Sequence, residues 1–218
     1  MKVLVCGQSR FGRDVAELVS TQPGWQLIAV SCPVRAENLD KLHILALNKE
    51  LPLIPTGSLC AESVDRVCPG GVDLIIAAHC HDFIGRKTRL RARLGVLGYH
   101  PSLLPRHRGR SAVEWAIRFR EAFTGGSVYW LNDTVDGGPV AAQRHVAIRP
   151  DDTPRELWAR DLAPLGLDLF AEVFASLATG QRPAVPQDHS LATWEPAIDG
   201  VPALRRPDLD LLPPPPPN

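Results

Sequence analysis

The chain carries no net charge and no hydrophobic run long enough to cross a membrane. Lys plus Arg and Asp plus Glu each number 24 among the 218 residues, and such a balance argues against a dedicated nucleic-acid binder. No apolar segment approaches the roughly 18 residues that a membrane-spanning helix needs. Residues 1–6 enter a strand-like pattern without the regions of a signal peptide. We therefore expect a cytoplasmic protein whose partners include neither nucleic acid nor a membrane.

Cysteine is sparse, and its spacing argues against a disulfide framework. The cysteines are odd in number, form no Cys-x-x-Cys pair and fall mostly within apolar runs. Thiols of this kind are typical of a reducing compartment, where they stay free. The five are Cys6, Cys32, Cys60, Cys68 and Cys80.

Familiar nucleotide-binding and hydrolytic motifs are missing as well. The chain contains no Gly-x-Ser-x-Gly nucleophile elbow and no P-loop. The segment "GQSRFG", residues 7–12, lacks the complete Gly-x-Gly-x-x-Gly pattern, and no acidic residue ends the next strand to bind a ribose. This segment therefore predicts a tight strand-to-helix turn in preference to a dinucleotide site.

Two histidines in "HCHD", residues 79–82, raise the question of a metal site. On a strand, His79 and His81 would share one face, which could hold zinc. The further ligands of a closed zinc site do not follow at motif spacing. We expect no metal here, and we expect the segment to line a pocket at a strand end.

What the chain does contain is a regular alternation of strand and helix patterns. Hydrophobic residues make up 44% and charged residues 22% of the chain, which suffices for a full core. The alternation predicts an α/β fold with a doubly wound, mostly parallel sheet. Expected strands cover residues 1–7, 25–32, 51–57, 72–80 and 94–100, and expected helices cover 8–20, 35–50 and 62–71.

The second half continues this pattern and then changes composition. A helix is expected at 111–122, and two strand-like runs, 125–131 and 140–148, flank the loop "NDTVDGGP". One long helix or two should follow Thr153, which has Glu156 at capping-box spacing. We expect one domain at residues 1–200 and a short C-terminal extension, the Pro-rich tail at 201–218. That tail is read as a mobile segment or a linker stub, and a neighbouring domain or a dimer partner stays open.

The segment "GYHPSLLPRHRG", residues 98–109, is the first candidate for chemistry. His100 ends an expected strand directly before a Pro-rich turn, and Asp136 lies in the glycine-flanked loop "VDGG". Ligands of doubly wound sheets bind outside the carboxyl ends of the strands, where two such side chains can meet. The alternative for His100 is a hydrogen-bonded structural histidine.

These residues carry a resemblance. The "YHPSLLP" segment followed by "VDGG" resembles the 10-formyltetrahydrofolate-dependent formyltransferase family, which carries Asn-x-His-Pro-Ser-Leu-Leu-Pro and a later Asp-x-Gly loop. The resemblance extends over roughly residues 1–200. The segments "GQSRFG", "GGSVYW" and "RPDDT" are especially similar to the hydrolase domain of 10-formyltetrahydrofolate dehydrogenase.

The resemblance implies a set of roles for named residues. It implies that His100 and Asp136 are catalytic, while Gly98 stands where the family has its third catalytic residue, an asparagine. It also implies a site for 10-formyltetrahydrofolate, the formyl donor, and a second site for the acceptor. The implied folate wall consists of Cys80, Phe83, Ile84, Asp136, Gly137 and Gly138, and the implied acceptor side of Gln8, Ser9, Arg10, Arg108 and Arg110.

The arginines of "RHRGR" have two interpretations. They form a solvated basic face, or they bind an anionic acceptor at the rim of the site. The chain lacks the glycine- and serine-rich first loop with which glycinamide ribonucleotide formyltransferase holds its substrate's phosphate, so that acceptor is not expected.

Three functions stay open at this point. The first is transfer of the formyl group to an amine of a small molecule, with a bound water, a backbone N–H, His79 or Ser102 replacing the missing asparagine donor. The second is hydrolysis of 10-formyltetrahydrofolate by a water that enters beside Gly98. The third is a degenerate folate-binding module. We favour transfer slightly over hydrolysis.

Overall fold

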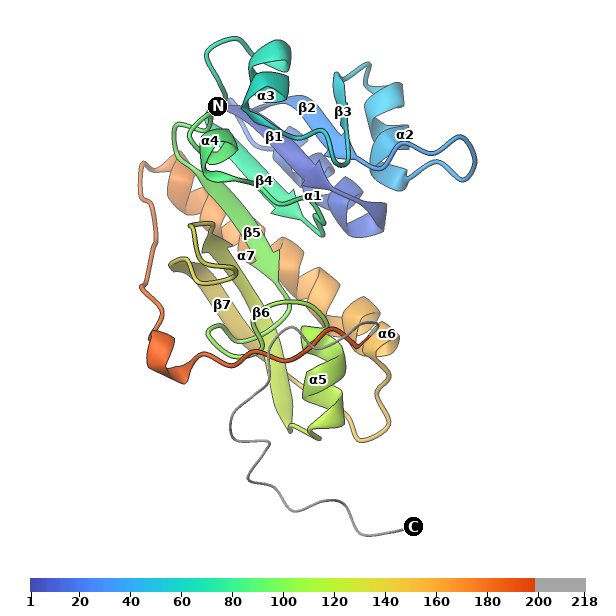
Figure 1. Ribbon diagram of the computed structural model, residues 1–218, viewed down its shortest axis with the longest axis vertical. Helices are drawn as coiled ribbons and strands as arrows, with labels where there is room; N and C mark the ends of the chain where they lie inside the picture. The colour runs from blue at the N-terminus through green and yellow to red at the C-terminus, as the bar shows by residue number, and fades with distance from the viewer. Residues whose placement is uncertain (199–218) are drawn as a thin grey trace.

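The apolar runs of the first hundred residues form five parallel strands at the centre of the fold. In the computed structural model, which describes residues 1–198, seven strands form one sheet in the order β3-β2-β1-β4-β5-β6-β7 (Figure 1). The last two strands run antiparallel to their neighbours. The strands are β1 Lys2–Gly7, β2 Gln26–Cys32, β3 Leu53–Pro55, β4 Leu74–Ala78, β5 Val96–His100, β6 Phe123–Trp130 and β7 Val140–Ala147. The predicted α/β fold class is confirmed, and the tail at 201–218 lies outside the described residues.

The helices follow the predicted pattern with one clear correction. The helix expected over residues 35–50 begins only at Lys41, because the Asp40 side chain accepts a hydrogen bond from the backbone of Leu42 and caps it there. The predicted capping box of Thr153 and Glu156 is present. The helices are α1 Ser9–Ser20, α2 Lys41–Asn48, α3 Ala61–Val67, α4 Arg86–Arg89, α5 Ala112–Arg118, α6 Pro154–Leu157 and α7 Ala163–Ala178.

The segment expected as one helix or two is a single helical run with a π-helical turn in its middle. The turn spans Trp158–Leu162 between α6 and α7. Helical insertions of this kind re-aim side chains and are common at functional sites. Here Trp158 packs edge-on against Phe11 and lies 5.9 Å from the ring of His79.

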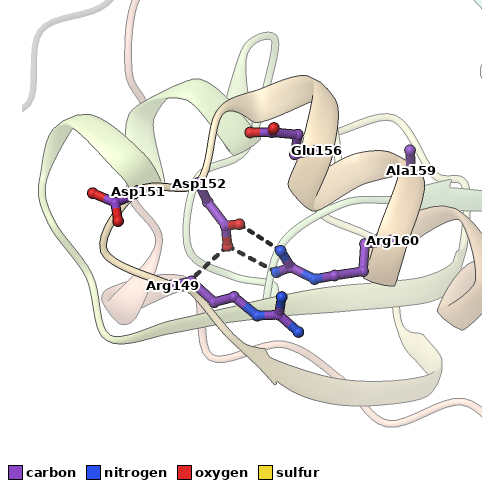
Figure 2. A pocket seen from close by; sticks show the side chains of 6 residues that line it. All are labelled: Arg149, Asp151, Asp152, Glu156, Ala159 and Arg160. Carbon is purple, nitrogen blue, oxygen red and sulfur yellow. Dashed lines mark hydrogen bonds and ion pairs between the residues drawn. The ribbon is translucent and has the colours of Figure 1, made fainter.

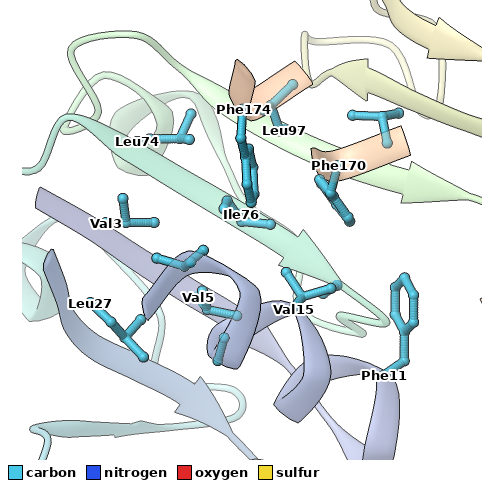
Figure 3. Packing of buried hydrophobic residues seen from close by; sticks show 14 of the residues in the cluster. Val3, Val5, Phe11, Val15, Leu27, Leu74, Ile76, Leu97, Phe170 and Phe174 are labelled. Atoms are coloured by element: carbon cyan, nitrogen blue, oxygen red, sulfur yellow. The ribbon is translucent and has the colours of Figure 1, made fainter. Parts of the chain in front are cut away.

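Each face of the sheet buries its own cluster of side chains. On one face, α1, α2 and α7 pack against the strands, with Phe11, Val15, Phe170 and Phe174 among the buried residues (Figure 3). On the other face, α3 and the segments around α4 cover residues such as Val96. Because side chains alternate along a strand, Gly98 and His100 point to the same face as Val96.

The residues after α7 form a strap, residues 181–198, that runs back across the domain. Val185 pairs with Val140 at the edge of the sheet, and Thr193 accepts a hydrogen bond from the backbone N–H of Arg108. Gln187 and Glu195 are buried. The strap therefore holds the two loops that follow β5 and β6.

Candidate active site

His100 is fixed at the end of β5 by the Pro-rich turn that follows it. The ring Nε2 lies 2.6 Å from the carbonyl oxygen of His107. A carbonyl only accepts hydrogen bonds, so Nε2 carries a proton and Nδ1 is the nitrogen left to gain or lose one. The side chain is buried except for a small part. The turn therefore aims Nδ1 of His100 at its neighbours.

Asp136 reaches this nitrogen from the loop between β6 and β7. Its Oδ2 lies 3.6 Å from Nδ1 of His100 and accepts a 2.7 Å hydrogen bond from the backbone N–H of Gly109. The Asp136 backbone is left-handed, with φ of 48°, and a non-glycine residue held in this way is frequent at functional sites. The two residues that the sequence singled out are thus side by side.

The loop needs both of its glycines. A Cβ at Gly138 would lie 1.6 Å from the carbonyl oxygen of Trp130, and one at Gly137 would lie 2.6 Å from a methyl carbon of Thr134. Gln187 of the strap donates hydrogen bonds to the backbone oxygens of Asp136 and Gly138. Close packing against Trp130 and Thr134 and hydrogen bonds from Gln187 therefore hold the loop in place.

Gly98 leaves no opening beside His100. A Cβ at Gly98 would lie 2.7 Å from the side chain of Leu131 and 3.0 Å from the ring of Tyr129. Ser102, considered as a replacement donor, is fully buried and donates to the backbone oxygen of Arg106 instead. Ser102, one of the alternatives for the missing donor, thus already has an acceptor, and side chains lie in the space considered for a water.

Sequence reasoning missed Tyr129. Its hydroxyl donates a 2.6 Å hydrogen bond to Oδ1 of Asp136. Burial, with the nearby charge of Asp136, raises the pKa of Tyr129 well above its ordinary value. The segment "GGSVYW" contained the signal, but reading it requires the antiparallel register that places Tyr129 opposite Gly98.

The three residues expected on the folate wall have different surroundings. Ile84 is 4% exposed and belongs to the core, whereas the Phe83 side chain is 80% exposed. Cys80 packs against the same cluster as Leu131. Burial raises the pKa of Cys80 to about 11, so the thiol is neutral at physiological pH. Phe83 and Cys80 can face a ligand, whereas Ile84 is buried in the core.

The first-strand side is more open than the His100 side. Gln8 lies 3.3 Å from Nε2 of His81, and the rings of His79 and His81 are 5.2 Å apart in an edge-on arrangement. The backbone N–H of Ser9 donates to Oδ2 of Asp40 at 2.7 Å. Arg10 is exposed and pairs with Asp14 on its own helix.

Arg108 does not lie at an exposed rim, which corrects the expectation. It is 3% exposed, and its guanidinium donates to the side-chain oxygen of Gln187 and lies 3.1 Å from Nδ1 of His189. Arg110, two residues later, is exposed. Within this irregular turn, Arg108 forms an isolated parallel bridge with Trp194 of the strap. Arg108 is therefore a structural link between the turn and the strap.

A shallow hollow lies elsewhere on the surface. It is lined by Arg149, Asp151, Asp152, Glu156, Ala159 and Arg160, where the carboxylate of Asp152 holds the guanidinium of Arg160 (Figure 2). None of the lining residues belongs to the His100 or Asp136 loops. We place the candidate site at those loops and not in this hollow.

Residues 1–198 contain neither a group of metal ligands nor a helix that could cross a membrane. Within them, His, Cys, Asp and Glu side chains form no group of three or more that could hold a metal ion. None of the helices in this part of the chain has the length and apolar character needed to span a bilayer.

Comparison with known proteins identifies the family of the chain. The family model described as "Formyl transferase" matches residues 7–167. Mitochondrial 10-formyltetrahydrofolate dehydrogenase of Mus musculus is 32% identical over 202 residues, which cover 89% of this chain and 22% of that protein. The chain thus spans about a fifth of the length of that relative.

Solved structures show the same fold. Glycinamide ribonucleotide transformylase 1 from Symbiobacterium toebii superposes with a TM-score of 0.70 at 20% identity, covering 86% of this chain and 94% of that one. The N-formyltransferase of Helicobacter canadensis, solved with folinic acid and dTDP-3-aminofucose, gives a TM-score of 0.71 at 17% identity, with coverages of 89% and 70%.

Proposed function

The chain belongs to the formyl transferase family, and from that premise we propose that it moves the formyl group of 10-formyltetrahydrofolate to the amine of a small-molecule acceptor. The observation that carries the proposal is the approach of His100 Nδ1 to Asp136 Oδ2, at 3.6 Å, within loops clamped by the strap. An imidazole and a carboxylate so arranged can move a proton at neutral pH.

The reaction needs a proton to move from the acceptor to the folate. The amine nitrogen attacks the formyl carbon, a new C–N bond forms, and the carbonyl electrons move onto oxygen. Collapse of this adduct breaks the bond to N10, which takes up a proton as the amine loses one. His100 Nδ1 donates to the developing oxyanion or to the departing nitrogen, and Asp136 holds the imidazole and helps to remove the amine proton.

We propose that the folate lies between Phe83 and the Asp136 loop. Phe83 offers an exposed aromatic face, and Cys80 a neutral apolar one. The acceptor would approach from the first-strand side, near Gln8 and the paired rings of His79 and His81. Aromatic rings and an amide at this position suit an acceptor with a flat or apolar body beside its amine.

Hydrolysis of 10-formyltetrahydrofolate is the second candidate. The dehydrogenase relatives favour it, because the mouse protein is named for that same folate. The packing around Gly98 argues against the expected route, since Tyr129 and Leu131 fill the space through which water would enter. Transfer is therefore the better-supported function.

One experiment separates these functions. The protein is incubated with 10-formyltetrahydrofolate, with and without a panel of amines, and loss of formyl is followed by absorbance and by mass spectrometry. Turnover only with a particular amine supports transfer and identifies the acceptor. Turnover without any amine supports hydrolysis. Folate binding without turnover would overturn both and leave a binding module.

A further inference from the structure

The chain has two tyrosines, and they lie on opposite faces of the sheet with different hydrogen-bond partners. Tyr99, in β5, donates to the backbone oxygen of Leu162 at 2.6 Å. Tyr129, in β6, donates to the carboxylate of Asp136 at the same distance. A phenol that donates a hydrogen bond to a carboxylate in a buried site can fix the orientation of that carboxylate.

The placement of Tyr129 follows from the strand register. Gly98 and Tyr129 are directly opposite in the antiparallel pair, as are His100 and Ser127. Residues two apart on a strand share a face, so Tyr129 lies on the same face as the His100 side chain. The ring occupies the volume that a side chain at Gly98 would need, with 3.0 Å between a Cβ there and the nearest ring carbon.

The two carboxylate oxygens of Asp136 accept hydrogen bonds from different donors. The phenol bonds Oδ1, the backbone N–H of Gly109 bonds Oδ2, and Oδ2 is the oxygen that faces His100. Because Tyr129 is 7% exposed and its pKa is raised by burial, its proton stays on the phenol and the hydroxyl remains a donor. Each donor favours the charged form of the carboxylate and restricts its rotation.

We infer that Tyr129 is a positioning residue for Asp136, and that Gly98 is a glycine because Leu131 and the Tyr129 ring together fill the space that a side chain there would need. The inference rests on the proposed function in its catalytic part. The structural part, a matched pair of Gly98 and Tyr129, stands on packing alone.

The catalytic part is tested with Tyr129→Phe, which keeps the ring and removes the hydroxyl. Tyr99→Phe is the matched control, because it also removes one phenol hydroxyl that donates a 2.6 Å hydrogen bond. We expect Tyr129→Phe to lower kcat roughly tenfold or more, with KM for the folate little changed. The pH–rate profile should also differ from that of the unmodified protein, since the lost hydroxyl contacts a carboxylate of the candidate site.

Tyr99→Phe should leave both kcat and the pH profile as in the unmodified protein. A Tyr129→Phe profile that coincides with that of Tyr99→Phe would overturn the catalytic part. If the unmodified protein turns over no folate at all, the proposed function fails instead, and the two failures are thereby distinguished.

The structural part is tested by thermal unfolding and needs no activity. Gly98→Asn should lower Tm, because the new side chain meets the Tyr129 ring and Leu131. In a Tyr129→Ala background the same substitution should lower Tm less, since the contact with the ring is gone while the contact with Leu131 remains. Additive changes in the two backgrounds would show that the residues are not a matched pair.

Discussion

The two sides of the candidate site are built in different ways. On the braced side, around His100 and Asp136, hydrogen bonds arrive from the turn after β5, from β6 and from the strap. On the open side, around Gln8 and His81, exposed side chains meet through one 3.3 Å contact and an edge-on ring pair. If the proposed function holds, the difference means that the groups proposed for proton transfer are held rigidly while the proposed acceptor side can adapt to its ligand.

The largest expected effect comes from removing the carboxylate charge of Asp136 on the braced side. Asp136→Asn keeps the size of the side chain but removes its charge, so kcat/KM should fall by roughly 10²–10⁴-fold, the usual worth of a positioned acid or base. Steady-state kinetics with 10-formyltetrahydrofolate measure this. Asp151→Asn, at an exposed aspartate, is the control and should match the unmodified protein. Nearly full activity in Asp136→Asn would remove Asp136 from the mechanism.

The next prediction compares a buried residue with an exposed residue of the implied folate wall. Ile84→Ala should reduce the free energy of unfolding by about 2–5 kcal/mol, because a buried side chain leaves a cavity. Phe83→Ala, at an exposed neighbour, should change stability by no more than about 0.5 kcal/mol and raise KM for the folate roughly tenfold, a loss of about 1.4 kcal/mol. Urea unfolding and KM measure the two. An unaltered KM in Phe83→Ala would place the folate elsewhere.

A smaller effect compares two arginines of one segment. Arg108→Ala removes buried hydrogen bonds to Gln187 and should lower the free energy of unfolding by about 1–3 kcal/mol. Arg110→Ala, at an exposed position, should change it by no more than about 0.5 kcal/mol and leave the acceptor KM unaltered. Chemical denaturation and acceptor kinetics check both. A raised acceptor KM in Arg110→Ala at native stability would instead support an anionic acceptor at the rim.

The smallest effect is a pH dependence of stability on the braced side. Burial lowers the pKa of His107, but hydrogen bonds to Glu121 and Glu195 outweigh it, so the net shift is upward. A group whose folded pKa lies above its unfolded value, about 6.5 for histidine, stabilises fully below that value and loses the contribution as pH rises through the folded pKa. Stability should therefore decline above about pH 6.5.

The variant His107→Gln isolates this contribution. The difference in unfolding free energy between the unmodified protein and His107→Gln should shrink as pH rises, and urea denaturation from neutral to alkaline pH measures it. A constant difference across that range would show that the His107 cluster does not change its proton content on folding.

Local pattern predicted much of this molecule, for identifiable reasons. The segments "VDLIIAAHC" and "LGVLGYH" are continuous apolar runs, which buried parallel strands require, so their place and the strand-end position of His100 could be read directly. The meeting of His100 with Asp136 followed from fold class and family resemblance together. Cap chemistry located Thr153 at a helix start.

Long-range contacts decided what pattern could not. The burial of Arg108 depends on Gln187, 79 residues away in an irregular segment, and no periodicity marks that partner. Tyr129 gained its role from a cross-strand register that exists only once β6 pairs antiparallel with β5. The late start of α2 came from one cap, Asp40, within a stretch that otherwise looked helical.

The carboxylate of Asp40 also occupies a position that another anion could otherwise take. Its two oxygens accept from the first backbone N–H of α1, at Ser9, and from the backbone of Leu42 in α2. The amino end of a helix attracts anions, but here a tethered carboxylate is already in place at a local concentration on the order of millimolar or higher. A phosphate brought by an acceptor would have to displace it. Asp40 thus takes the place at the amino end of α1 where an anion could otherwise bind, and it links the start of α1 to the start of α2.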